Sequence, residues 1–432
     1  MEAPSINVGL MTEKTVSFVF NENYALAESG DVFTGEQKAS LRDGMIDFNG
    51  KLYGELLFEP LSPAASSFDV KEVTIGIDFH WQRKENQRFR GALNMVVQGD
   101  GIVVINRVDV EEYLTSVISS EMSATASAEF LKAHALISRS WLLAQIDSSK
   151  HPATHQTSCR TGDELVRWYD REDHDLFDVC ADDHCQRYQG ITRASTPLVA
   201  EVIRATRGEI LVHNGEICDT RFSKCCGGIT ERFENVWQPT PHSYLIALRD
   251  GRDADFPDLT VEAEAERWIA TSPAAFCNTR DREILGQVLN NYDQETTDFF
   301  RWEVRYSQEQ LSELIRRKSG MDFGDIIDLV PLKRGASGRI EKLKIVGTRL
   351  TYTIGKELEI RRTLSESHLY SSAFTVVKET LPDGAHFRLT GAGWGHGVGL
   401  CQIGAAVMGA RGYDYRQILS HYFPGAEIEK RY

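Results

Sequence analysis

The residue best placed for acid–base chemistry is Glu121, which continues the apolar stripe of a predicted helix. That helix begins after Asp109 and has Glu112 in the position of a capping box. Its apolar positions recur at helical spacing, at Val110, Tyr113, Leu114, Val117 and Ile118. Desolvation on such a stripe favours the protonated carboxyl, which is the form that a general acid needs. The structural alternative is a helix-end glutamate that reaches solvent or pairs with a core arginine.

Two basic residues on the next predicted helix, about 126–146, are candidates for substrate binding. Arg139 lies on the apolar stripe of that helix and is the natural ionic partner of Glu121. A close guanidinium would favour the charged carboxylate and oppose the acid role, so Arg139 could instead hold a polar group of the substrate. The alternative is a structural ion pair. Lys132, on the same helix, completes this basic set.

Histidine and cysteine are concentrated in the polar segment 147–186, which we expect to be a long loop. The spacing H-x5-C-x3-H-C supplies four candidate ligands, His174, Cys180, His184 and Cys185. Two imidazoles and two thiolates match a tetrahedral structural zinc site, in which four protein ligands leave no open position. Neighbours that could replace one of them are His151, His155 and Cys159. The alternative is a polar loop with incidental Cys and His.

Glycine occupies every second position of the segment 391–399, G-A-G-W-G-H-G-V-G. A strand edge without side chains lets a ligand or another backbone approach closely. Trp394 offers an aromatic face for a sugar, while His396 and Gln402 offer hydrogen-bonding groups. The segment fits neither a phosphate loop nor a dinucleotide-binding fingerprint. We therefore expect it to line the same groove as Glu121; the alternative is a tightly packed strand.

The eight cysteines are too sparse for a disulfide scaffold, yet five of them fall between 180 and 226. Adjacent Cys225 and Cys226 precede a Gly-Gly turn. One of the two could pair with Cys401 or Cys218, or all could be buried thiols.

Composition excludes several classes of protein. The formal charge of −15 at pH 7 argues against general nucleic-acid binding and against docking on anionic lipid. No stretch of the sequence is apolar for long enough to span a membrane. The start, MEAPSINVGL, has no signal core, which leaves either a cytoplasmic protein or one whose leader has been removed.

The pattern of elements predicts an α+β fold: a β-rich core with a helical hairpin that carries the active site, a β-rich N-terminal region and an α+β insertion. Residues 5–106 are predicted to be β-rich, because short apolar or alternating runs lie at 6–11, 15–21, 45–58, 68–79, 89–98 and 101–108. Further expected strands lie at 187–192, 199–205, 209–213, 216–223 and 343–362, and further helices at 307–320, 400–410 and 414–422. With 432 residues, we expect four regions, at 1–100, 101–248, 249–380 and 381–432.

Three ordered motifs resemble the stage II sporulation protein D family, also called SpoIID/LytB. EEYLTSVISSEMSATASAEFLKAHALISRSW is similar to its Y-L-x-x-V-V-x-x-E-M-P and E-A-L-K-A-Q-A-x-A-A-R-T patterns. RFSKCCGGITE resembles its Gly-Gly segment, and GWGHGVGLCQIGAAVMGARGYDYRQILSHYFPGA its C-terminal motifs. The resemblance covers about 105–430. Departures from the family pattern are Ser123 for Pro, His134 for Gln and Cys401 for Ser.

The resemblance implies a peptidoglycan lytic transglycosylase, which cleaves between N-acetylmuramic acid and N-acetylglucosamine and leaves 1,6-anhydro ends. Glu121 matches the catalytic acid, Arg139 matches the arginine of A-A-R-T, and the His/Cys set matches a zinc site in some members. The implied partners are glycan strands, the implied cofactor is structural zinc with no organic group, and the implied location is extracytoplasmic. The alternatives are a non-catalytic, glycan-binding enhancer of a cell-wall amidase and a zinc hydrolase, which would need an open coordination position.

Overall fold

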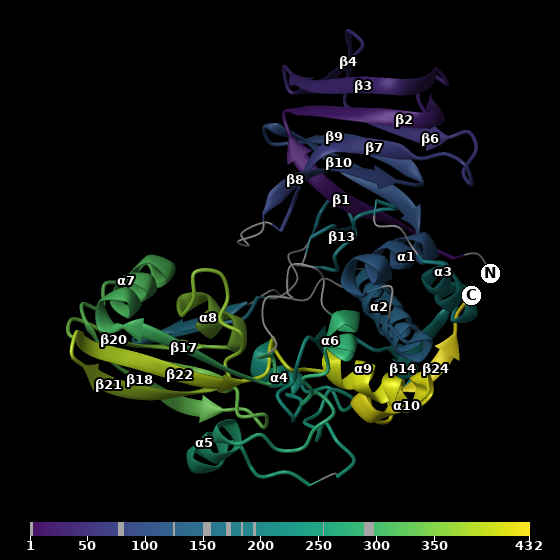
Figure 1. The fold of residues 1–432 in the computed structure, drawn as a ribbon. Helices are drawn as coiled ribbons and strands as arrows, with labels where there is room; N and C mark the ends of the chain where they lie inside the picture. The colour runs from purple at the N-terminus through teal and green to yellow at the C-terminus, as the bar shows by residue number, and fades with distance from the viewer. Residues whose placement is uncertain are drawn as a thin grey trace.

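The computed structural model describes residues 3–76, 82–123, 126–149, 157–169, 174–182, 185–192, 196–253, 255–288 and 298–432. Within these ranges an N-terminal sheet stands on a group of helices, and a second β-rich part lies beside the helices (Figure 1). This mixture of sheets and helices confirms the predicted α+β class. Among the helices of the described ranges, none has both the length and the apolarity needed to cross a bilayer.

The N-terminal sheet has eleven strands, in the order β13-β1-β10-β9-β6-β2-β3-β4-β5, with β7 on β2 and β8 on β7. They are β1 (Ser5–Glu13), β2 (Thr15–Leu26), β3 (Val32–Arg42), β4 (Met45–Phe48), β5 (Lys51–Tyr53), β6 (Glu55–Pro60), β7 (Phe68–Ile75), β8 (Arg83–Phe89), β9 (Ala92–Gln98), β10 (Gly101–Asp109) and β13 (Val179–Cys180). Val16, Phe18 and Phe20 alternate with more exposed residues along β2, so one face of the sheet enters the core.

The central part consists mainly of helices, with two small sheets. Its elements are α1 (Val110–Glu121), α2 (Ala128–Ser149), α3 (Pro197–Ala205), α4 (Phe233–Val236), α6 (Arg282–Val288), α9 (Gln402–Ala410), α10 (Tyr415–Tyr422), β14 (Glu209–His213), β15 (Glu216–Ile217), β16 (Phe222–Ser223), β23 (Leu400–Cys401) and β24 (Glu427–Lys430). The Asp109 side chain caps α1 by accepting from the Glu111 N–H at 2.8 Å. All five stripe residues of α1 are buried in one core with the N-terminal sheet, as predicted.

The second β-rich part has its own core, centred on residues such as Leu343, Phe374 and Phe387. Two sheets surround it, in the orders β11-β12-β20-β19-β18 and β17-β22-β21. The elements are β11 (Ser158–Thr161), β12 (Glu164–Arg167), α5 (Glu262–Ala270), β17 (Arg301–Ser307), α7 (Gln308–Ser319), β18 (Ile326–Arg334), β19 (Ile340–Gly347), β20 (Thr351–Gly355), α8 (Glu357–Thr363), β21 (Phe374–Leu381) and β22 (Gly384–Ala392).

Several predicted strands are wrong. Residues 199–205 form α3, because Thr196 caps the Val199 N–H and Pro197 occupies the first turn. Residues 187–192 are irregular, and the end of the run 343–362 is helical, in α8. The glycine-rich segment leaves β22 at Ala392, because Gly393, Gly395, Gly397 and Gly399 all have positive φ.

Candidate functional site

Glu121 is the last residue of α1, where the buried stripe of that helix meets the surface. Its side chain is partly exposed, whereas the stripe residues Val117 and Ile118 below it are fully buried. The backbone N–H of Arg187 donates to Glu121 Oε1 at 3.4 Å. The carboxylate thus has an apolar side, a backbone donor and access to solvent, which together suit proton transfer to a bound molecule.

The segment that supplies Arg187 is held firmly against α1 and α2. Gln186 Nε2 donates to the Ser138 carbonyl oxygen at 3.4 Å, and the Gln189 N–H donates to Ser116 Oγ at 3.1 Å. The Tyr188 hydroxyl donates to Asn106 Oδ1 at 2.5 Å, deep in the core. These contacts fix the segment 186–189 in place beside Glu121. We call this segment the wall.

Three of the four predicted zinc ligands lie together directly before this wall. The ligand atoms of His174, Cys180 and Cys185 are all within 4.8 Å of one another, and His174 Nε2 lies 3.5 Å from Cys185 Sγ. Cys180 belongs to β13, which pairs in parallel with β1 and so fixes one ligand to the N-terminal sheet. His184 lies outside the described residues, as do His151 and His155. The donors that are described fit zinc, which binds imidazole and thiolate.

The zinc-type cluster and Glu121 share one neighbourhood, as the environment of Tyr113 indicates. Burial raises the pKa of the Tyr113 hydroxyl well above its usual value, and electrostatic interactions with Cys185, Cys180, Tyr188 and Glu121 add to this shift. Tyr113 Oη also lies 3.4 Å from Gln186 Oε1, in the wall segment. Cys159, named as a substitute ligand, is instead exposed in β11.

The predicted pairing of Arg139 with Glu121 is wrong. The fully buried guanidinium of Arg139 makes a bidentate ion pair with Glu111, at 3.0 and 2.7 Å, and donates to the Glu209 carbonyl oxygen at 2.9 Å. Glu111 lies ten residues before Glu121, about 15 Å along the axis of a helix that rises 1.5 Å per residue. Arg139 therefore forms a structural ion pair, which was the alternative to substrate binding. Its guanidinium is too deeply buried to contact a substrate.

Lys132 also has a protein partner. Its Nζ donates to Glu129 Oε1 at 2.6 Å and lies 5.6 Å from the centre of the Tyr415 ring. The Tyr415 N–H in turn donates to Glu129 Oε2 at 2.9 Å. Lys132 thus connects α2 to the first turn of α10. None of these contacts involves Glu121.

Gln402 lies in the interior and not in a groove, which contradicts its predicted place. The side chain is 2% exposed, and its Nε2 is 3.1 Å from His134 Nε2. His134 Nδ1 is 3.2 Å from Ser138 Oγ, so a buried polar chain joins α9 to α2. Burial lowers the pKa of His134 to about 3, which keeps this imidazole neutral near neutral pH.

The alternate glycines make room for protein atoms. A Cβ at Gly391 would lie 2.1 Å from the Trp302 ring, one at Gly393 2.7 Å from the Cys225 carbonyl oxygen, and one at Gly397 2.4 Å from the Arg339 guanidinium. The alternative of tight packing therefore accounts for the glycines themselves. A ligand is not needed to explain them.

The two aromatic residues between these glycines have different surroundings. His396 packs against Trp237 with ring centres 4.9 Å apart, and its Nδ1 accepts from the Val398 N–H at 3.0 Å. Burial lowers the pKa of His396 well below its usual value, and three nearby arginines add to the effect. Trp394 and His396 are both partly exposed, but only Trp394 lines a cavity of about 70 Å³, together with Asp298, Trp302, Glu303 and Tyr370. This cavity makes Trp394 the better suited of the two to contact a ligand.

Comparisons with known proteins agree with the resemblance found in the sequence. Residues 98–213 match a family model described as stage II sporulation protein, and residues 231–399 match a domain of unknown function, DUF8618. The chain is 27% identical over 342 residues to an uncharacterised protein of Brachyspira hyodysenteriae, covering 79% of this chain and 72% of that protein.

Two relatives from Bacillus subtilis carry functional names. The stage II sporulation protein D is 24% identical over 328 residues, covering 76% of each chain. The amidase enhancer is 23% identical over 243 residues, which span 53% of this chain and 32% of the enhancer. The Glu121 helix and the His/Cys loop both fall within the range of the first family model.

Proposed function

Since this chain is a relative of the SpoIID family, we propose that it acts on the bacterial cell wall as a lytic transglycosylase of peptidoglycan glycan strands. The bond cleaved would join N-acetylmuramic acid to N-acetylglucosamine, outside the cytoplasm. The observation that carries the proposal is the position of Glu121, which ends the family's signature helix partly exposed and beside a fixed backbone donor.

One carboxyl group is enough for this reaction. Glu121 gives its proton to the glycosidic oxygen, which leaves with N-acetylglucosamine as the bond to C1 of the muramic residue breaks. The 6-hydroxyl oxygen of that muramic residue then bonds to C1, and its proton passes to the Glu121 carboxylate. The product is a 1,6-anhydro ring, no water is consumed, and Glu121 returns to its starting form. A hydrolase would usually need a second carboxylate beside the bond.

The surroundings of Glu121 support the second half of this cycle. The Arg187 N–H stabilises the carboxylate after the proton has left, because a hydrogen bond to an ionised acceptor is the stronger kind.

We further propose that zinc bound by His174, Cys180, His184 and Cys185 holds the wall in place. Cys185 is only two residues before Arg187, so a metal that fixes Cys185 also limits the movement of the donor to Glu121. Four protein ligands would make this metal structural. Trp394, together with Tyr370 in the small cavity, is the proposed aromatic contact for the glycan.

Product analysis tests the proposal directly. Purified chain is incubated with glycan strands stripped of stem peptides, and the products are analysed by mass spectrometry. Fragments with 1,6-anhydro-muramic ends, formed without any other protein, are expected. Fragments with reducing muramic ends would show hydrolysis and contradict the mechanism.

The relative named amidase enhancer supports a second candidate, a glycan-binding protein that stimulates a separate amidase. The same incubation distinguishes the two functions. Under this second function the chain sediments with the strands, leaves them uncut and raises the rate at which an added cell-wall amidase releases stem peptides.

A further inference from the structure

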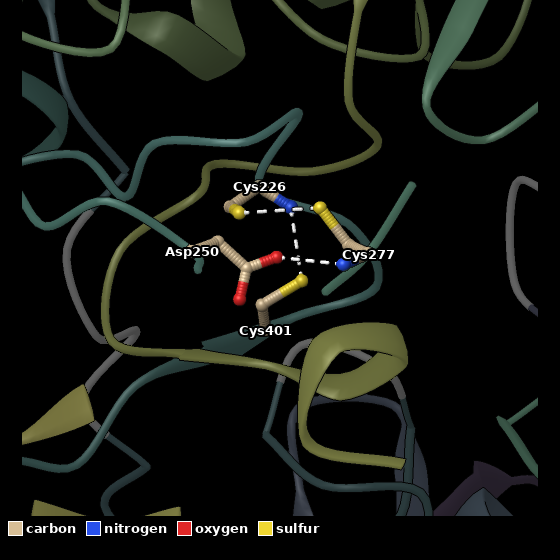
Figure 2. Close-up of side chains that lie close together, drawn as sticks. All are labelled: Cys226, Asp250, Cys277 and Cys401. Carbon is tan, nitrogen blue, oxygen red and sulfur yellow. Dashed lines mark hydrogen bonds between the residues drawn. The ribbon is translucent and has the colours of Figure 1, made fainter. Parts of the chain in front are cut away.

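A second cysteine cluster lies deep in the protein, away from the His/Cys loop. It combines the thiols of Cys226, Cys277 and Cys401 with the carboxylate of Asp250, and their ligand atoms are all within 4.8 Å of one another (Figure 2). The four residues are between 0 and 2% exposed. They come from four separate parts of the chain, so tertiary folding alone brings them together.

The spacing of the sulfurs suits one shared metal ion. Cys226 Sγ and Cys277 Sγ are 3.6 Å apart. Zinc–sulfur bonds of about 2.3 Å in a tetrahedron place neighbouring sulfurs roughly 3.7 Å apart. A disulfide would need a sulfur–sulfur distance of about 2.05 Å. The observed geometry therefore matches two ligands of one ion better than two halves of a disulfide.

Three of the four ligand groups also accept hydrogen bonds that orient them. The Cys226 N–H donates to Cys401 Sγ at 3.2 Å, and the Gly228 N–H donates to Cys226 Sγ at 3.4 Å. Asp250 accepts from the Cys277 N–H at 2.8 Å and from the Tyr422 hydroxyl at 2.7 Å. Metal sites in proteins usually have such hydrogen-bond donors around them, because the donors orient the sulfur and carboxylate ligands.

Two arginines provide positive charge near the cluster. Arg301 donates to the Gly227 carbonyl oxygen at 3.1 Å, and Arg339 donates to the Cys226 carbonyl oxygen at 3.2 Å. A divalent ion bound by three thiolates and a carboxylate carries net negative charge, which is costly to bury without such compensation. The two guanidinium groups thus offset part of the negative charge that a bound ion and its ligands would bury.

We propose that Cys226, Cys277, Cys401 and Asp250 bind one zinc ion. Thiolates select zinc among the common divalent ions, and a carboxylate can complete a tetrahedral site. With four protein ligands the ion is structural. It fastens the Gly-Gly turn after β16, the loops that carry Asp250 and Cys277, and the start of α9. The Cys225 thiol also lies within interaction range of Cys277 and Cys401, which makes it the rival for the fourth ligand position.

Metal analysis of a variant that lacks the loop thiols tests this inference separately from the glycan chemistry. Cys180→Ser/Cys185→Ser removes two ligands from the loop cluster and leaves the interior cluster intact. Purified without chelator, this variant is expected to retain about one zinc per chain by elemental analysis. Cobalt(II) exchanged into it should give the sulfur-to-cobalt absorption bands of a thiolate site.

Substitutions in the same background locate the ligands. Cys277→Ser and Asp250→Asn should each abolish stoichiometric zinc, whereas Cys218→Ser, which removes another buried cysteine outside the cluster, should retain it. Retention of zinc by Asp250→Asn together with its loss from Cys225→Ser would overturn the assignment of Asp250.

A thiol count on the unsubstituted chain covers the case in which the variants fold poorly. The chain is denatured with chelator and without reductant, and its thiols are alkylated and counted by mass. Zinc at two equivalents per chain with all eight thiols alkylated supports the proposal. Six alkylated thiols would reveal a disulfide, and eight thiols without zinc beyond the loop site would show buried free cysteines; either result overturns it.

Discussion

The two cysteine clusters differ in how the chain builds them. The loop cluster gathers His174, Cys180 and Cys185 from a short stretch and is partly exposed, and Arg187, two residues after Cys185, donates its N–H to Glu121. The interior cluster collects Cys226, Asp250, Cys277 and Cys401 across most of the C-terminal half, and all four are buried. A cluster closed by a short loop can order only its own segment, whereas one closed by distant segments stabilises their arrangement.

This difference leads to different expectations for loss of metal. Loss from the loop should loosen the wall that carries Arg187, and so affect chemistry more than stability. Loss from the interior should release the Gly-Gly turn and α9, and so affect stability more than chemistry. The predictions below, from the largest expected effect to the smallest, can break or sharpen this contrast.

Glu121→Gln should abolish turnover, because the amide cannot donate and recover a proton. General acid–base groups contribute roughly 100- to 10,000-fold to the rate, so at most a few per cent of cleavage should remain. Release of anhydro-muramic products is the measurement. Glu112→Gln, on the same helix, is the matched control and should cleave normally. Cleavage by Glu121→Gln above a few per cent of the unsubstituted rate would show that Glu121 is not the general acid. The catalytic site would then have to lie elsewhere than beside the loop cluster.

Arg139→Met should destabilise the fold, because it leaves the Glu111 carboxylate buried without its cation. Removing one partner of a buried ion pair costs about 3–5 kcal/mol. Denaturant unfolding measures the loss, and cleavage per folded molecule should be unchanged. A variant with normal stability and weak glycan binding would restore Arg139 as a substrate contact.

Cys277→Ser should lower the thermal midpoint by on the order of 10 °C, through loss of metal binding energy that exists only in the folded state. Calorimetry with and without added zinc measures this. The control, Cys218→Ser, should shift the midpoint much less and show no dependence on zinc. Equal shifts in the two variants would mean that the interior cluster is ordinary packing.

Cys185→Ser should reduce cleavage by about 10- to 100-fold, the range found when groups that support a metal or its ligands are changed. The thermal midpoint should fall by less than in Cys277→Ser, because only a local segment is released. A chelator should likewise remove zinc from the partly exposed loop before it reaches the buried cluster. A time course of zinc release with parallel activity assays checks both points, and loss of zinc without loss of activity would contradict the proposed wall.

His134→Gln should flatten the dependence of stability on mildly acidic pH. The pKa of His134 is lowered to about 3 in the fold, so the unfolded chain takes up this proton first. The stability of the fold is therefore complete above an unfolded pKa of about 6.5 and declines below it, by at most about 1.4 kcal/mol per pH unit. Glutamine retains a polar partner for Gln402 and removes the titration. Unfolding curves at several pH values give the comparison, and parallel curves for both proteins would exclude this effect.

Local sequence signals predicted the elements that carry the candidate site. The cap at Asp109 and the stripe from Val110 to Ile118 are confirmed, and Gly320 ends α7 with φ of 70°. β3 was missed because its residues are mostly polar, with Ala39 the one fully buried side chain in the strand. α3 was taken for a strand because its β-branched residues outweighed the Thr-Pro start signal.

Partners of buried side chains were less predictable than burial itself. The stripe of α2 correctly places Arg139 in the core, yet Glu111 and not Glu121 is its partner. Gln402 and His134 are 268 positions apart, and their contact depends on how α9 crosses α2. The spacing of residues in a sequence predicts which side chains are neighbours within a helical turn or a short loop. It does not predict where two helices cross.

The sequence by itself determined the α+β class, the resemblance to the SpoIID family, the helix that ends at Glu121 and the short-range gathering of Cys180 and Cys185. The class and the resemblance rest on patterns and motifs along the chain, whereas the helix end and the cysteine pair depend on spacing within one helix or one short loop, which local backbone geometry converts into proximity. Only the tertiary structure decided that the glycines of 391–399 accommodate protein atoms, that Arg139 serves the core, and that four distant segments bring Cys226, Asp250, Cys277 and Cys401 together. These contacts arise from the packing of whole helices and strands. Buried polar groups need hydrogen-bonding partners, and the tertiary fold determines which residues are close enough to serve.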